Sequence, residues 1–293
     1  MTTALPPSRW QALEADHEAR VDAATAGHRA RREAGRAHPV EDFLFRYYRN
    51  TPARLRRWYP GAGVRLEGAS GTERAGWRHH RVVGEDVEVD VPAFLADRSR
   101  TVRFVRELLA ATVSRPPQLG CFGLHEWAMA YRLAPDELRH RGRALRLGSA
   151  GTDAVVERHT IRCSHHDAYR FFTEDARPRN TLTPTREGQV ALEQPGCLHA
   201  GMDVYKWAYS LAPVVPSDLT LDAFDLAREI RVLDMQASPY DLRDLGYQPV
   251  RIETPAGKAE YLERQRAFTD RSNALRRRLL DVLDRLELPS QTA

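Results

Sequence analysis

The chain has 293 residues, 42% hydrophobic and 29% charged, with a formal net charge of +4. This length and composition allow one large hydrophobic core and argue against disorder throughout. No run of about 18 apolar residues occurs, which excludes a membrane-spanning helix and predicts no membrane partner. The first residues lack the apolar segment of a signal peptide and the three cysteines are an odd number, so we expect a reducing, cytoplasmic location.

The predicted elements of the N-terminal half are helices around a small sheet. Residues 7–35 carry apolar side chains at spacings of three and four, which predicts one long helix that ends before Pro39. Residues 64–89 contain short alternating runs separated by glycines, which predict roughly two or three antiparallel strands. Residues 92–115 place an apolar stripe on one helical face that ends before Pro116.

Further helices are predicted around 198–212 and 218–235, and a charged helix is predicted from about Ala256. The chain is therefore expected to be mainly α with α+β character, a helical domain with a small antiparallel sheet in its N-terminal half. We expect a single domain over residues 1–293. Within it, residues 1–37 form a peripheral N-terminal helix, and residues 256–293 form a C-terminal helix and tail.

Aromatic and arginine residues alternate between positions 42 and 63, and Arg54, Arg56 and Arg57 are among them. Aromatic rings can stack on bases while arginines hold phosphates. The alternative is a short amphipathic helix that packs its aromatic rings into the core while its arginines extend into solvent. In both interpretations the arginines can bind anions.

Residue types that commonly serve in catalysis or metal binding are concentrated in four segments between positions 121 and 241: CFGLHEW, RCSHHDAYRFF, PGCLHAGMDVYKWAY and LDMQASPYDL. The second segment holds Cys163, His165 and Asp167 within five positions. Because neighbouring residues diverge by about 100° on a helix, only one of the adjacent histidines can point into a site with its neighbours. The competing interpretation is that His165 packs or caps while the next histidine faces solvent.

The third segment places His199, Asp203 and Trp207 on one helical face, since they are spaced by four. Such a set can orient a water molecule, stabilise a cation and stack on a flat ring. A surface His–Asp pair would have the same spacing. Lys206 could form a Schiff base if it were desolvated.

Two Cys-x-His pairs, Cys163 with His165 and Cys197 with His199, offer thiolate and imidazole ligands for zinc or iron. Their spacing is not that of a standard zinc finger. Further ligands could come from Asp167, Asp203 or His125. His125 begins a segment like the HExxH motif, but Met129 stands where the second histidine is required, which excludes that metalloprotease type.

The sequence lacks the motifs of three common enzyme classes. It contains no GxxxxGK[ST] loop for nucleotide hydrolysis, no GxGxxG after a strand for hydride transfer and no GxSxG elbow for α/β-hydrolase chemistry. Taken together, the segments HPVEDFLFRYY, RCSHHDAYRFF, QPGCLHAGMDVYKWAYSL and LDMQASPYDL resemble a family of bacterial proteins commonly labelled 3-methyladenine DNA glycosylase. The resemblance extends from Trp10 to the final helix. The sequence departs from established glycosylases in lacking a helix-hairpin-helix motif with a Gly-rich hairpin.

This resemblance implies a hydrolase that removes alkylated purine bases from DNA and needs no cofactor. A flipped cationic base would stack on aromatic rings while a carboxylate stabilises the developing sugar cation. The implied catalytic candidates are Asp203, Asp234, His199, His165 and Asp167. The implied substrate-binding candidates are Trp207, Tyr205, Lys206, His125, Arg54, Arg56 and Arg57.

Two other functions remain open from the sequence. The first is a zinc- or iron-dependent enzyme that acts on a small polar substrate through the Cys/His/Asp cluster, with Cys163, His165, Cys197 and His199 as its ligands. The second is a non-catalytic nucleic-acid-binding protein in which the histidines are core and capping residues. No feature of the sequence predicts the oligomeric state.

Overall fold

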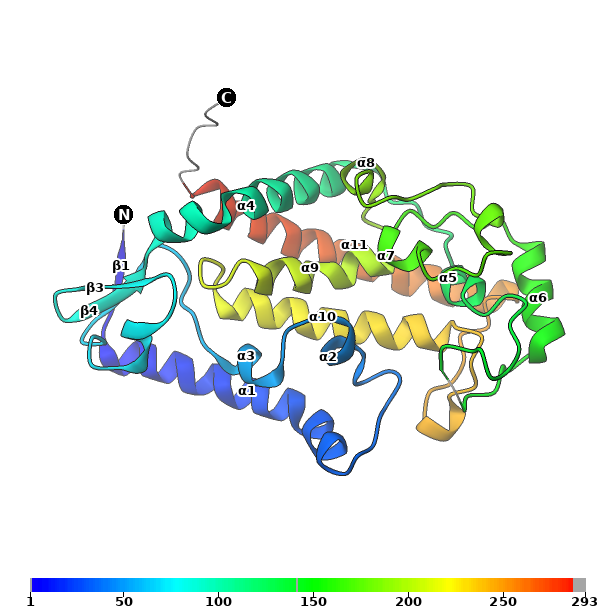
Figure 1. Cartoon of the computed structure of the whole chain (residues 1–293), viewed down its shortest axis with the longest axis horizontal. Coiled ribbons are helices and arrows are strands. Elements are labelled where there is room, and N and C mark those ends of the chain that lie inside the picture. Colours follow the sequence, from blue (N-terminus) through cyan, green and yellow to red (C-terminus); the bar gives the residue numbers. More distant parts are fainter. Residues whose placement is uncertain (1, 141, 287–293) are drawn as a thin grey trace.

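A computed structural model describes residues 2–140 and 142–286 (Figure 1). Helices dominate it, and a small sheet lies at one end, which confirms the mainly α prediction. The long helices are α1 (Pro7–Glu33), α4 (Val91–Ser114), α9 (Leu198–Ser210), α10 (Ser217–Gln236) and α11 (Pro255–Asp284). None of the described helices is long and apolar enough to cross a membrane.

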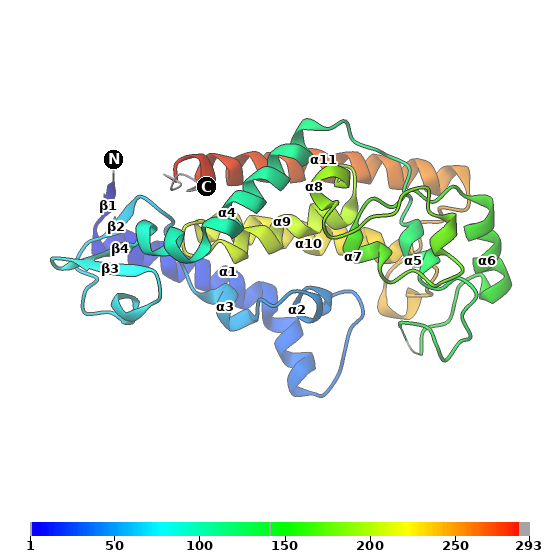
Figure 2. The same ribbon diagram turned by 45° about the horizontal axis from the view of Figure 1, so that its top comes forward.

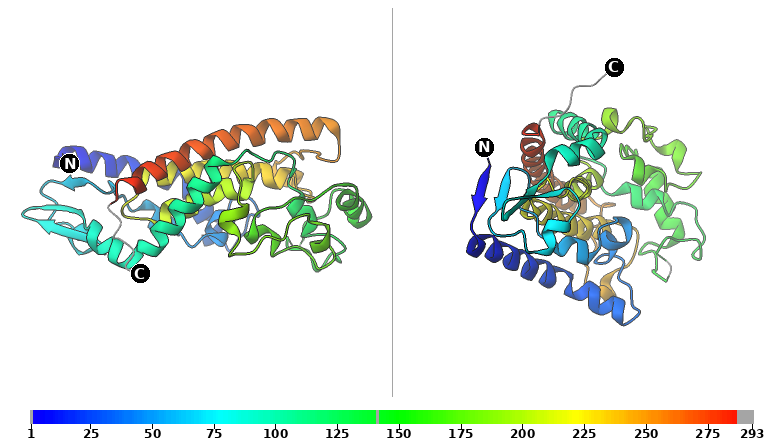
Figure 3. Two further views of the ribbon diagram at one scale, coloured as in Figure 1. Left: turned by 90° about the horizontal axis from the view of Figure 1, so that it is seen from above. Right: turned by 60° about the vertical axis from the view of Figure 1, so that its left-hand side comes forward.

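Helices α9 and α10 form the centre of the bundle, and α1, α4 and α11 surround them (Figure 3). The core-facing stripe of α10 includes Phe224, Ala227, Ile230 and Leu233, all completely buried. Gly201 allows close packing of α9, because a Cβ at this position would lie 2.9 Å from Cδ1 of Ile230. The short connection after α9 reverses the chain direction, so the beginning of α9 lies beside the end of α10.

The sheet has the strand order β1-β2-β4-β3. Its strands are β1 (Thr3–Leu5), β2 (Val64–Leu66), β3 (His80–Val83) and β4 (Asp86–Val89). The antiparallel pairs β2–β4 and β3–β4 match the prediction for residues 64–89. The purely antiparallel prediction was wrong for β1, which pairs in parallel with β2. A parallel pair needs a long connection, and α1 lies within it.

Short helices build the end of the molecule opposite the sheet, where α5, α6 and α7 gather (Figure 2). These three helices are α5 (Leu124–Ala128), α6 (Gly148–Arg158) and α7 (His166–Tyr169). Three other short helices lie along the bundle: α2 (Phe43–Tyr47) against α10, α3 (Pro52–Arg56) against α1 and α8 (Gln189–Leu192) against α4. The 3₁₀ turns are η1 (Glu73–Gly76), η2 (Arg177–Arg179) and η3 (Arg243–Leu245).

Long helices occur near both ends of the chain as predicted, although Thr3–Leu5 within the predicted N-terminal helix of residues 1–37 form the strand β1. α1 lies on the outside of the bundle against α3 and α10, and α11 covers α4, α9 and α10. The predicted C-terminal tail at residues 287–293 lies outside the described residues. Whether residues 1–293 fold as one cooperative domain stays a prediction.

Candidate functional site

Polar side chains from five parts of the chain meet inside the bundle. The contributing parts are α5, the residue before α7, the first half of α9, the end of α10 and the residue after α2. α5, α7 and these ends of α9 and α10 lie together in Figure 1. The site therefore lies at the end of the molecule away from the sheet.

The first half of the site is an ion cluster around Asp234, which is completely buried. Nε2 of His125 lies 2.8 Å from its Oδ1, and Nη1 of Arg231 donates to its Oδ2 over 2.6 Å. The same Arg231 nitrogen donates to Oε1 of Glu126 over 2.9 Å. With the imidazole protonated, two cations and two carboxylates balance each other, which offsets the cost of burying them.

The second half is centred on Asp203, which is 1% exposed. Its Oδ1 accepts a hydrogen bond of 2.8 Å from the hydroxyl of Tyr48, and its Oδ2 lies 3.4 Å from Nε2 of His165. Nζ of Lys206 donates to Asp203 over 3.2 Å and to Asp167 over 3.4 Å. Asp167 and Lys206 are partly exposed, so this half of the site extends from the interior to the surface.

His199 lies between the two halves. The centroid of its ring is 4.4 Å from that of His125, in an edge arrangement, and 5.3 Å from that of His165, in a stacked one. Its Nδ1 atom is buried and has no hydrogen-bond partner. A buried nitrogen lone pair or N–H without a partner costs free energy, so this atom marks a place for a further ligand.

The pKa values of the three histidines diverge. Burial opposes the charged form of His125, but the Asp234 carboxylate outweighs it and raises the pKa of His125 to about 10. Burial likewise opposes charge on His165, and the hydrogen bond to Asp203 raises its pKa. Burial, followed by the charges of those two neighbours, lowers the pKa of His199 well below its usual value. An imidazole with a lowered pKa thus lies between two imidazoles whose pKa values are raised.

Lys206 is an ammonium ion in this setting. Burial disfavours its charge, but Asp203 and Asp167 outweigh the burial and raise its pKa. A lysine with a raised pKa is not a nucleophile at neutral pH, so the geometry does not favour Schiff-base chemistry. Lys206 instead connects the exposed carboxylate to the buried one.

Among the described residues, His125, His199 and Asp234 form the one group that could hold a metal ion. Each offers a ligand atom, and these three atoms all lie within 4.8 Å of one another. The predicted quartet of Cys163, His165, Cys197 and His199 is not brought together in this way. Sγ of Cys163 instead lies 3.7 Å from the carbonyl oxygen of His165. Burial raises the pKa of both Cys163 and Cys197, which favours neutral thiols over metal-binding thiolates.

A pocket of about 370 Å³ opens beside the second half of the site. Asp167, Lys206 and Trp207 line it, together with Phe104, His166, Arg186 and Gln189. The Trp207 ring makes an edge contact with Phe104 at 5.7 Å, and Nζ of Lys206 lies 4.6 Å from its centroid. The pocket therefore offers aromatic surface beside both signs of charge.

Several predicted substrate-binding residues lie elsewhere. Tyr205 is completely buried, and its hydroxyl accepts a hydrogen bond from Asn50, so its ring is not available for stacking on a substrate. Arg56 forms ion pairs with Glu18 and Asp22 on α1, and these carboxylates occupy its guanidinium. Arg54 and Arg57 line a separate cleft between α3 and α4.

Three site residues were missed by the sequence analysis: Tyr48, Glu126 and Arg231. Arg231 precedes Asp234 by three positions on the apolar face of α10, which is a detectable signal for a buried ion pair. Glu126 directly follows His125 in the chain. Tyr48 carried no distinguishing signal, because its partner Asp203 is 155 positions away.

No protein-family model, curated protein or solved structure matches the chain or its fold. The resemblance to the family labelled as a glycosylase therefore stays a prediction, and the function is argued from the site itself.

Proposed function

We propose that the protein is a metal-dependent enzyme whose zinc or iron ion is held by His125, His199 and Asp234. The observation that carries this proposal is that His199, whose buried Nδ1 has no hydrogen-bond partner, belongs to a group of three ligand residues with ligand atoms within 4.8 Å of one another. Two imidazoles and one carboxylate suit zinc or ferrous iron, and three protein ligands leave coordination positions for water and substrate. The predicted cysteine ligands are replaced by His125 and Asp234.

The surroundings of the triad fit this role. Arg231 fixes the orientation of the Asp234 carboxylate through a bond of 2.6 Å, as partners of metal ligands commonly do. The low pKa of His199 keeps its imidazole neutral, the form that binds metals. His125, whose pKa is raised by Asp234, would release its extra proton when the metal binds. A bound divalent ion would supply an activated water or polarise a carbonyl or phosphoryl group.

Polar side chains of the chain lie between the pocket and the triad. A small polar substrate fits the pocket of about 370 Å³, where Lys206 and Arg186 attract negative charge and Asp167 accepts hydrogen bonds. From this pocket, ion pairs connect Asp167 through Lys206 to Asp203 and His165. His165 stacks on His199, so the pocket is connected to the triad by polar side chains.

Elemental mass spectrometry of the protein purified without chelator tests the proposal. We expect about one equivalent of zinc or iron in the wild type and loss of that metal in His199→Gln. The control is His159→Gln, which alters a half-buried histidine whose Nδ1 lies 2.7 Å from a backbone oxygen. Circular dichroism would establish that each variant is folded. A folded wild type without metal, or a His199→Gln variant that keeps its metal, would contradict the proposal.

Base excision is a second candidate, favoured by one observation. The pocket beside Trp207 and Phe104 combines aromatic rings with the carboxylate of Asp167. Asp203 and Asp234 are almost fully buried and hydrogen-bonded, so Asp167 is the better placed of the three carboxylates to reach a flipped base. Release of methylated purines from alkylated DNA, abolished in Asp167→Asn, would support this function. Equal release by that variant would exclude the assignment.

A non-catalytic nucleic-acid-binding protein remains the third expectation. It predicts salt-sensitive DNA binding that survives substitution of His125, His199 and Asp234. The ion clusters would then serve stability alone.

A further inference from the structure

A second polar cleft of about 710 Å³ lies where α3, α4 and the connection between α9 and α10 approach one another. Four arginines line it: Arg49, Arg54, Arg57 and Arg98. The other lining residues include several neutral hydrogen-bonding groups, among them Asn50, Tyr59, Tyr209 and Ser217. None of the described residues that line the cleft is an aspartate or a glutamate.

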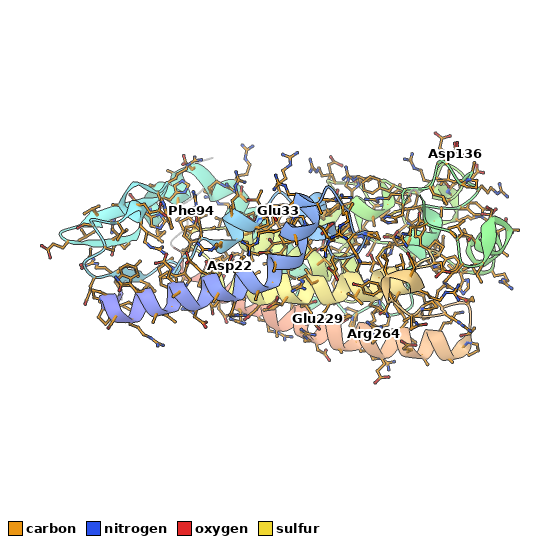
Figure 4. All side chains as sticks on the ribbon, turned by 90° about the horizontal axis from the view of Figure 1, so that it is seen from below. Asp22, Glu33, Phe94, Asp136, Glu229 and Arg264 are labelled. Atoms are coloured by element: carbon orange, nitrogen blue, oxygen red, sulfur yellow. The ribbon has the colours of Figure 1, made fainter. Side chains whose placement is uncertain are left out.

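The arginines of this cleft form no ion pairs among the residues that the structure describes. Arg56, which lies between Arg54 and Arg57 in the sequence, shows the contrast, because it pairs with Glu18 and Asp22 on α1. Figure 4 labels Asp22 on that helix.

Three of the four guanidinium groups are nevertheless held in place. Nη2 of Arg98 donates to the carbonyl oxygen of Ser210 over 3.0 Å, and Nη1 of Arg54 donates to that of Arg49 over 3.4 Å. The guanidinium carbon of Arg57 lies 5.4 Å from the centroid of the Trp77 ring. These contacts restrain the side chains without neutralising them, so their remaining N–H groups are available to an anion.

We propose that this cleft binds the phosphoryl group of a small anionic ligand. Guanidinium groups donate two parallel hydrogen bonds to phosphate oxygens, and the tyrosine and asparagine side chains carry further N–H and O–H groups. The volume of the cleft lies within the range of about 300–1,000 Å³ that is usual for small-molecule sites. A concave site of this size favours a compact phosphate compound over the backbone of a DNA duplex.

This site is separate from the proposed metal site. Tyr209 and Ser210 end α9, whereas His199 lies in its first turn. Ten residues of helix correspond to about 15 Å along the axis. Phosphoryl binding here and metal binding at the triad are therefore independent, and either can fail without the other.

Isothermal titration calorimetry with inorganic pyrophosphate, at constant ionic strength and without added metal, tests the inference. The wild type is compared with Arg54→Gln and with the control Arg56→Gln, which removes the same charge from the same helix outside the cleft. We expect Arg54→Gln to weaken binding about tenfold and Arg56→Gln to change it less than about twofold. Arg49→Gln, a second exposed cleft arginine, should behave like Arg54→Gln.

Three results would overturn the inference. The first is no detectable heat of binding with the folded wild type. The second is equal weakening in Arg54→Gln and Arg56→Gln, which would reduce the effect to overall charge. The third is binding of a DNA duplex, measured by fluorescence anisotropy, without any binding of pyrophosphate.

Discussion

Arg231→Met would test whether the positive and negative charges in the first half of the site compensate each other. The side chain of Arg231 is 2% exposed and donates to both Glu126 and Asp234. Its guanidinium carbon lies 3.9 Å from the centroid of the Phe43 ring. Methionine keeps an unbranched apolar side chain against that ring while removing the charge, so the effect should come from electrostatics more than from a cavity.

The expected loss is large. In protein freed of metal with EDTA and lacking Arg231, two buried carboxylates face a single counter-charge on His125, which leaves one uncompensated negative charge in the interior. Removing one partner of a buried ion pair costs about 3–5 kcal/mol. Glu126→Gln in the same chain should restore neutrality, because the remaining Asp234 carboxylate is then matched by the His125 imidazolium. We therefore expect the double variant to be more stable than Arg231→Met alone.

Urea unfolding of the wild type, both single variants and the double variant gives this comparison as a double-mutant cycle. The free energies of unfolding should be strongly non-additive, with a coupling of about 1–3 kcal/mol between positions 126 and 231. Two results would refute the reasoning. One is a loss below about 1 kcal/mol in Arg231→Met, and the other is additive behaviour in the double variant.

Three further outcomes follow from buried or crowded groups. Tyr48→Phe deletes a hydrogen bond to a buried carboxylate and should cost about 1.5–3 kcal/mol in urea unfolding, whereas Tyr47→Phe, whose buried hydroxyl has no partner, should cost little. Gly201→Ala should cost about 1–3 kcal/mol, because its Cβ would lie 2.9 Å from a side-chain carbon of α10; an equally stable variant would contradict the packing argument. Burial opposes ionisation of Asp42, but the hydrogen bonds from Arg31 and His28 lower its pKa in the folded state. The stability from Asp42 is thus present above its unfolded pKa of about 4 and is lost as the pH falls; unfolding followed against pH should show a flatter acid limb in Asp42→Asn.

Local sequence periodicity predicted most of the fold. The helix at residues 92–115 and the pair at 198–212 and 218–235 correspond to α4, α9 and α10. These elements bury continuous apolar stripes, and burial dominates their formation. The parallel strand β1 escaped prediction because its pairing with Val64–Leu66 depends on a partner 61 residues away, as the register of Thr3 with Val64 shows.

The sequence predicted which residues belong to the candidate site better than it predicted which side chains contact one another there. The spacing of His199 and Asp203 correctly indicated one face of a helix, and both side chains are buried. They do not pair with each other, however, because Asp203 pairs with His165 and Tyr48. His199 instead contacts His125 and His165, each from a distant segment. Helical spacing determines which side chains share a face, whereas tertiary packing determines what meets that face.

Burial distinguishes the two enzymatic functions proposed for this site. A glycosylase carboxylate must reach the sugar of a flipped nucleotide. Asp203 and Asp234 are only 1% and 0% exposed, and their carboxylates are hydrogen-bonded to other side chains. A metal ligand has no such requirement, since burial of a ligand behind a coordinated ion is usual. The partly exposed pair of Lys206 and Asp167 connects the pocket to the buried carboxylate. The polar network thus reaches from the pocket into the interior, and metal chemistry would in addition require the substrate to reach the triad.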